Sequence, residues 1–243
     1  MSFRILLVPG VNPDRWLRVW GERIADVPAA LVHSEAADAV ARLRAGEAEV
    51  ALVRLPIDRD GIAAIPLYEE VTMVVVPKDH VVTVVEEVPV EDLADEVLVV
   101  PDDDLLHWAD APGTPFSGGE VPTTADAIEL VAAGVGVVLL PQSVARLHQR
   151  RGLTARAVPG APTSTVALVW LEDRYDELTE EFIGIVRGRK ANSSRGRGAA
   201  PEPPAKDKKK PRPASAGKKP TPGASGRVPL RQSTTKHRPR KGR

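Results

Sequence analysis

The sequence contains no cysteine and no long hydrophobic run. Without cysteine, the chain can hold neither a disulfide framework nor a thiolate site. No apolar stretch approaches the roughly 18 residues that a membrane-spanning helix requires. The apolar run that starts at Phe3 breaks at Pro9-Gly10, which makes it too short for a signal peptide. We therefore expect a cytoplasmic protein with no membrane partner.

Lysine is also scarce in most of the chain. Residues 1–190 contain two lysines, Lys78 and Lys190, whereas residues 191–243 contain eight. Up to Lys190 there are 17 Lys and Arg against 31 Asp and Glu, a net charge of −14. Residues 191–243 contain 16 Lys and Arg against 2 Asp and Glu, a net charge of +14. The overall net charge of zero therefore divides into an acidic body and a basic tail. Such an asymmetry suggests a polyanionic partner for the tail.

Residues 191–243 are rich in Pro, Gly, Lys and Arg and contain no aromatic residue. They cannot bury enough apolar surface to offset the entropy of ordering the chain. Proline recurs too often for a helix or a central strand. We predict that this segment is disordered and that it begins near Arg189.

The tail has two interpretations. Two of its segments, Arg195–Arg197 and Arg238–Arg243, are similar to the minor-groove-binding cores of AT-hook peptides. Contact with DNA would then depend on phosphates and counterion release. The alternative is a solubilising tail that folds back on the acidic body. The residues predicted to contact nucleic acid are Arg195, Arg197, Lys208, Lys209, Lys210, Arg238, Arg240, Lys241 and Arg243.

The body alternates between apolar strands and amphipathic helices. Expected strands cover residues 3–8, 29–33, 49–54, 62–68, 71–80, 96–101, 137–140 and 164–171. Expected helices start at Pro13, with Asn12 as N-cap, at Glu35, with Ser34 as N-cap, at Val90, at Thr123/Thr124 and at Asp176. Near-continuous Val, Leu and Ile in the strands favours mostly parallel sheets covered by helices.

Four segments, taken in order, resemble the effector-binding region of LysR-type transcriptional regulators. They are LRAGEAEVALVRLP (43–56), IPLYEEVTMVVVPKDH (65–80), VEDLADEVLVVP (90–101) and TTADAIELVAAGVGVVLLPQSVARL (123–147). The last is the most specific, because a helix, Gly-x-Gly, an apolar strand and Leu-Pro follow at the spacing of that family. The resemblance covers roughly residues 3–188.

The resemblance implies an α/β, type 2 periplasmic-binding-protein-like fold of two α/β subdomains joined by two crossover strands. The effector-binding domain would be residues 1–190, with subdomain I at about 1–75 and 164–190 and subdomain II at about 78–163. The crossovers would fall near Val74–Pro77 and Ser164–Ala167. The family pairs these domains side by side, which implies a homodimer. Its members begin with a winged helix-turn-helix, which we expect to be missing because the first binding-domain strand starts at Phe3.

The same resemblance implies a ligand site between the subdomains, where helix N-termini present free N–H groups and partial positive charge. Together with Arg54, these ends favour a small anion such as a carboxylate. The predicted ligand-binding residues are Pro9, Gly10, Val11, Asn12, Ser34, Arg54, Thr123 and Thr124. The ordinary alternative is a helix cap for Asn12, Ser34, Thr123 and Thr124, and a surface or ion-paired residue for Arg54. The family often has Ser or Thr where this chain has Pro9-Gly10.

The rest of the body shows no catalytic constellation. Five histidines are scattered without metal-ligand spacing, and Asp102–Asp104 is typical of a solvated acidic loop rather than of a Mg²⁺ site. There is no P-loop, nucleophile elbow or dinucleotide fingerprint. Trp16 and Trp20 share a helical face, which indicates either core or a dimer surface. We expect no metal, no cofactor and no enzymatic activity.

The sequence thus predicts a ligand-sensing regulatory protein that binds a small, anionic metabolite and contacts DNA non-specifically through its tail. Two alternatives remain open. The domain could bind no ligand and pair with full-length LysR-type regulators, or it could be a scaffold in a nucleoid- or RNA-associated protein.

Overall fold

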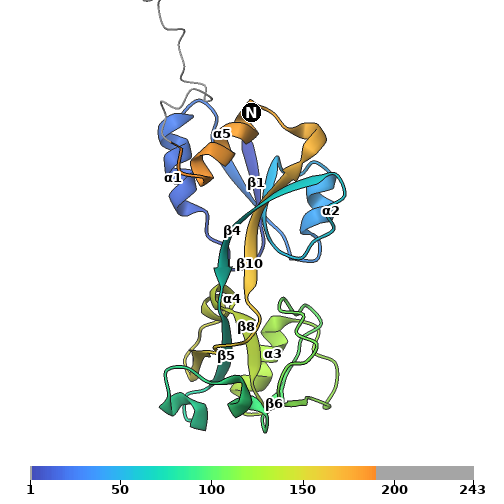
Figure 1. Ribbon diagram of the computed structural model, residues 1–243, viewed down its shortest axis with the longest axis vertical. Helices are drawn as coiled ribbons and strands as arrows, with labels where there is room; N and C mark the ends of the chain where they lie inside the picture. Colours follow the sequence, from blue (N-terminus) through green and yellow to red (C-terminus); the bar gives the residue numbers. More distant parts are fainter. Residues whose placement is uncertain (1, 190–243) are drawn as a thin grey trace, which may run out of the picture. The chain divides into compact units, whose positions relative to one another are not determined.

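The computed structural model describes residues 2–189, which form two α/β subdomains (Figure 1). The tail residues predicted to contact nucleic acid lie outside the described residues. None of the helices in residues 2–189 is long and apolar enough to cross a membrane.

Each subdomain has its own sheet. The strands of the first are β1 (Phe3–Leu7), β2 (Ala29–His33), β3 (Val50–Arg54), β4 (Ile62–Glu70) and β10 (Ser164–Leu171). Its helices are α1 (Asp14–Arg23), α2 (Ala39–Arg44), η3 (Glu172–Arg174) and α5 (Glu177–Val186). The second has the strands β5 (Thr72–Pro77), β6 (Val97–Leu98), β7 (Thr114–Pro115), β8 (Val138–Pro141) and β9 (Leu153–Ala157). Its helices are η1 (Val81–Val84), η2 (Val90–Leu93), α3 (Thr124–Ala132) and α4 (Gln142–Leu147).

The first sheet has the strand order β2-β1-β3-β10-β4. β1 pairs in parallel with β2 and β3, whereas β10 is antiparallel to β3 and β4. All residues of β3 are buried, which explains its uninterrupted apolar sequence before Arg54. Helices α1 and α5 pack against each other on one side of this sheet (Figure 1).

An aromatic cluster holds α1 and α5 to the sheet. Phe3 stacks on Trp20 with ring centroids 4.5 Å apart, and Phe182 lies 5.5 Å from Phe3. The indole N–H of Trp20 donates to the carbonyl of Val27 at 2.7 Å. Trp16 and Trp20 are 6% and 1% exposed. The core interpretation of these two residues is therefore confirmed, and they offer no surface to a second copy.

The second sheet contradicts the expectation of mostly parallel strands. Its order is β8-β5-β9, and β5 is antiparallel to both neighbours. A parallel pair appears only at the short strands β6 and β7 among the named strands of this subdomain. The prediction failed because a strand buried on both faces has the same apolar sequence whichever way its neighbours run.

The chain passes from the first sheet to the second at Glu70–Thr72. The predicted crossover at Val74–Pro77 is wrong, because Val74 pairs with Leu139 of β8 and Arg156 of β9 inside the second sheet. The chain returns from the second sheet to the first where β10 begins. There Ser164–Ala167 forms the first half of β10 and pairs with the end of β4. An apolar run identifies a strand but not the sheet to which it belongs.

Two of the predicted helix starts need correction. Helix α2 begins at Ala39 with Asp38 at the N-cap, and the hydroxyl of Ser34 donates to the carbonyl of Glu35 at 3.0 Å instead of capping a helix. Turn residues separate β2 from α2 here, so the helix starts later than its composition suggests. Helix α1 begins at Asp14, whose N–H donates to the side-chain oxygen of Asn12 at 2.8 Å.

Candidate ligand-binding site

A cleft of about 790 Å³ is lined by residues of both subdomains. This volume lies within the range of small-molecule sites, about 300–1,000 Å³. The first subdomain contributes Pro9, Glu35, Ala36, Ala37, Val40 and the residues from Arg54 to Asp58. The second contributes Asp102–Leu105, His107, Thr123–Ala125, Val144, Leu147 and His148.

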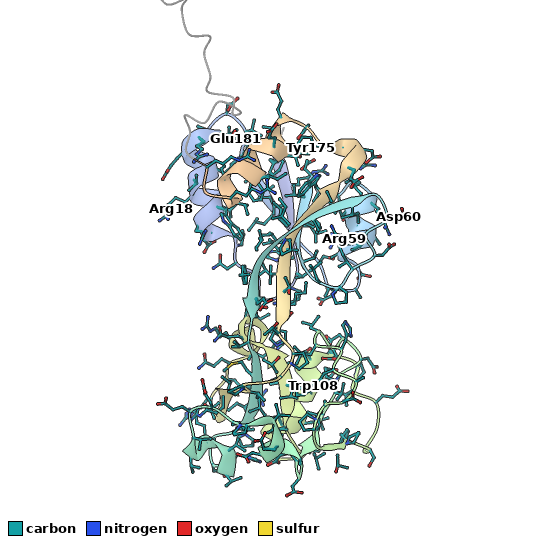
Figure 2. All side chains as sticks on the ribbon, in the orientation of Figure 1. Arg18, Arg59, Asp60, Trp108, Tyr175 and Glu181 are labelled. Atoms are coloured by element: carbon teal, nitrogen blue, oxygen red, sulfur yellow. The ribbon has the colours of Figure 1, made fainter. Side chains whose placement is uncertain are left out.

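The cleft forms where strands and helices of the two subdomains end. Arg54 is the last residue of β3, Pro9 follows β1, and Thr123 precedes α3. The loop after β3 continues to the exposed residues Arg59 and Asp60 (Figure 2). Carboxyl ends of strands and amino ends of helices thus face the same space, as in other open α/β sheets.

The structure brings half of the predicted ligand-binding residues into this cleft. Pro9, Arg54, Thr123 and Thr124 line it. The others line a neighbouring cavity of about 710 Å³, to which Pro9 also contributes; they are Gly10, Val11, Asn12 and Ser34. For all eight residues, a role in ligand binding stays a prediction.

Arg54 is held by the protein itself. Its side chain is 3% exposed and forms an ion pair with Glu70 at 2.9 Å, and the Glu70 side chain is 6% exposed. Nη1 donates to the carbonyl of Pro9 at 2.7 Å, and Nη2 donates to Oγ of Ser143 at 2.8 Å. The positive charge expected to attract an anion is therefore compensated, and it connects the first subdomain to α4 of the second.

Glu70 and Ser143 are partners of Arg54 that the sequence did not reveal. Glu70 lies 16 residues after Arg54, at the far end of β4, and Ser143 lies in the other subdomain. Gly10 also approaches Ser143: a Cβ on Gly10, whose φ is +82°, would come within 2.6 Å of the Ser143 hydroxyl. Glycine is therefore required at this contact between subdomains.

The threonines at the start of α3 also have partners within the protein. Thr123 accepts a hydrogen bond from the N–H of Asp126 at 3.2 Å, so its role as N-cap is confirmed. The hydroxyl of the buried Thr124 donates to Oδ1 of Asp103 at 2.8 Å. The carboxylate of Asp103 therefore accepts the hydrogen bond from Thr124 that the sequence assigns to a ligand carboxylate.

The acidic residues around the cleft differ in how well they are paired. Asp104 accepts hydrogen bonds from the N–H groups of Leu106 and His107, at 3.1 and 2.8 Å. The N–H of Asp60 and the guanidinium of Arg44 hold the pKa of Asp58 below its usual value.

Glu35 and Asp102 stand apart from these paired acids. Their side chains have no hydrogen bond or ion pair with another residue of the described range 2–189. The same range holds no group of three His, Cys, Asp or Glu residues placed to bind a metal.

Two α/β subdomains with a cleft between their strand ends define a two-lobed ligand-binding domain of the periplasmic-binding-protein type. The chain belongs to the LysR substrate binding domain family, whose model matches residues 14–191.

Named relatives and solved structures agree with this assignment. A probable hydrogen peroxide-inducible genes activator of Mycobacterium avium is 29% identical over an alignment of 201 positions, which covers 76% of this chain and 64% of the relative. The oxidized form of OxyR superposes with a TM-score of 0.59 at 24% identity, over 77% of this chain and 98% of that one. The BenM effector binding domain with its effector benzoate superposes with a TM-score of 0.63 at 20% identity. The superposition covers 77% of this chain and 90% of the BenM chain. These two structures establish the fold.

Proposed function

We propose that this chain is the ligand-sensing part of a transcriptional regulator and that it binds a small metabolite in the cleft between its subdomains. The observation that carries the proposal is the cleft itself, because its volume suits a metabolite and both subdomains line it. The family is one of regulators, and a relative in it has been solved with the small molecule benzoate in its effector-binding domain.

Binding would act on the geometry of the two subdomains. A ligand that touches both walls stabilises the arrangement in which those walls have the right separation. In the described residues, the hydrogen bond from Arg54 to Ser143 and the close approach of Gly10 already connect the two sides. A ligand would add contacts to this connection and thereby bias the subdomain arrangement that the rest of a regulator reads.

The proposal predicts that the full chain is stabilised by a metabolite from a broad library. A ligand at about 100 times its Kd adds about 2.7 kcal/mol to the free energy of unfolding. Thermal unfolding with each compound measures the effect. Ala37→Trp, which places an indole in the cleft, should abolish it.

Ala132→Trp, on the exposed side of α3, is the matched control and should keep the response. A library that leaves the melting temperature of the unmodified chain unchanged would contradict the sensor proposal and favour the ligand-free interaction module.

Peroxide, suggested by the name of the Mycobacterium avium relative, requires separate treatment. The protein groups that form a reversible disulfide on oxidation are cysteine thiolates. This chain has no cysteine. Any response of this domain must therefore arise from non-covalent binding or from another group, and formation of a disulfide within it cannot be the signal.

We also propose that the basic tail contacts nucleic acid. The support is the charge of residues 191–243, with 16 Lys and Arg against 2 Asp and Glu. The body has the opposite charge and should be repelled by phosphates. Contact would be non-specific, because clustered cations recognise the phosphate backbone rather than base edges.

A further inference from the structure

The fixed charges around the cleft are mostly negative. One arginine, Arg54, lines it together with two histidines. The lining carboxylates are Glu35, Asp58, Asp102, Asp103 and Asp104. Since Glu70 compensates Arg54 and Arg44 compensates Asp58, the remaining four carboxylates determine the sign of the electrostatic potential in the cleft.

Two side-chain donors that could hold an anion, those of Arg54 and Thr124, are already engaged. The guanidinium of Arg54 donates to Glu70, Pro9 and Ser143, and the hydroxyl of Thr124 donates to Asp103. A ligand carboxylate would have to displace a carboxylate of the chain to reach either donor. Displacing Glu70 would leave that buried side chain without its partner, which is costly.

Two acceptors, by contrast, are available. The carboxylates of Glu35, from the first subdomain, and Asp102, from the second, line the cleft and have no side-chain partner among residues 2–189. Apolar side chains of Val40, Ile57 and Val144 line the same cleft. This combination suits a ligand with a hydrocarbon body and a cationic head that can donate hydrogen bonds.

We propose that the cleft selects a small cationic ligand, an alkyl or aryl amine or a guanidine compound, over a carboxylate of the same skeleton. The inference rests on the proposed function, because it assigns a ligand class to the effector site proposed above. It differs from the anion that the sequence predicted from several helix starts and Arg54, because the guanidinium of Arg54 and the hydroxyl of Thr124 already have partners in the fold.

Matched ligand pairs test the inference on the full chain. Benzylamine is compared with benzoate, and butylamine with butyrate, by calorimetric titration at low ionic strength. The amine of each pair should bind at least about tenfold more tightly than the carboxylate, a difference of about 1.4 kcal/mol. The preference should fall as salt is added, because exposed charges are screened.

Variants locate the effect. Glu35→Gln and Asp102→Asn each remove one carboxylate that has no side-chain partner in the described residues, so the fold should persist and the preference for the amine should fall severalfold. Asp110→Asn removes an exposed carboxylate that does not line the cleft and should leave the preference unchanged.

The outcomes separate the two proposals. Tighter binding of the carboxylates overturns the cationic ligand but leaves the cleft as an effector site. If neither member of either pair binds, the cationic ligand is overturned, and the thermal screen with the metabolite library decides the effector site separately. If the amines bind but Glu35→Gln and Asp102→Asn behave like Asp110→Asn, the amines bind elsewhere and the inference is wrong.

Discussion

At the scale of single residues, Arg54 shows how one side chain can hold several parts of the fold together. Its guanidinium and the carboxylate of Glu70 are both buried, and the pair spans the ends of β3 and β4. Removing one member of a buried pair leaves the other charge uncompensated. The same guanidinium reaches Pro9 and Ser143, so the loss of Arg54 also loosens the contact between subdomains.

We therefore expect Arg54→Ala to lower the free energy of unfolding by about 3–5 kcal/mol, the usual cost of breaking a buried ion pair. The double variant Arg54→Leu with Glu70→Leu should recover much of this loss, because it leaves no uncompensated charge. Urea unfolding followed by circular dichroism measures both values.

The exposed pair of Arg150 and Glu129 supplies the control. Arg150→Ala should lower the free energy of unfolding far less than Arg54→Ala does, because exposed ion pairs contribute little to stability. If Arg54→Ala lowers the free energy of unfolding as little as Arg150→Ala does, a structural role for Arg54 is contradicted.

At the scale of elements, helix starts depend on side chains within a few residues. Thr123 at the start of α3 and Asp176 at the start of α5 each accept a hydrogen bond from the N–H three positions later. Capping of this kind satisfies an N–H that the helix leaves without a partner. The start of α2 differs because β2 ends at His33 and a turn follows before Asp38.

The cap of α3 gives a prediction at this scale. Thr123→Ala should lower the free energy of unfolding by about 1 kcal/mol, whereas Thr123→Ser should keep most of the stability, because serine retains the oxygen that accepts the N–H of Asp126. The matched control is Thr163→Ala, at an exposed threonine with no side-chain hydrogen bond among the described residues. Equal losses at the two positions in chemical denaturation would show that the cap contributes nothing.

At the scale of the whole molecule, the charges divide between an acidic body and a basic tail. A body with a net charge of −14 repels phosphates, so any affinity for DNA should come from residues 191–243. The family resemblance also implies that two copies pair, which remains a proposal and can be checked by analytical ultracentrifugation. The buried Trp16 and Trp20 cannot form such a contact, so the pairing surface must use other residues.

The division of charge predicts the outcome of a salt titration of DNA binding. The full chain should bind with a Kd of roughly micromolar order, and the affinity should fall steeply as salt displaces the phosphate contacts. Residues 191–243 alone should bind more tightly, because the acidic body no longer competes. Residues 1–190 should not bind. Binding by residues 1–190 as tight as by the full chain, or binding that is insensitive to salt, would show that the tail is not the contact.

The sequence by itself determined the strands and helices that have a strong local signal. β10 covers the predicted residues 164–171, and α3 begins behind the predicted cap Thr123. It also determined the two-lobed fold, through four segments whose order and spacing resemble one family, and the absence of thiol chemistry. These features depend on composition or on residues a few positions apart, so they can be read along the chain.

Only the tertiary structure decided the direction of the strands in the second sheet, the position of the first crossover and the chemistry of the cleft. The partners of Arg54 are 16, 45 and 89 residues away, and Asp103 meets Thr124 across 21 residues. No local pattern encodes such contacts, because they exist only after both sheets have formed. Arg54 and Thr124 look like free donors in the sequence but have partners in the fold, and that difference is the reason why we propose a cationic ligand for the cleft.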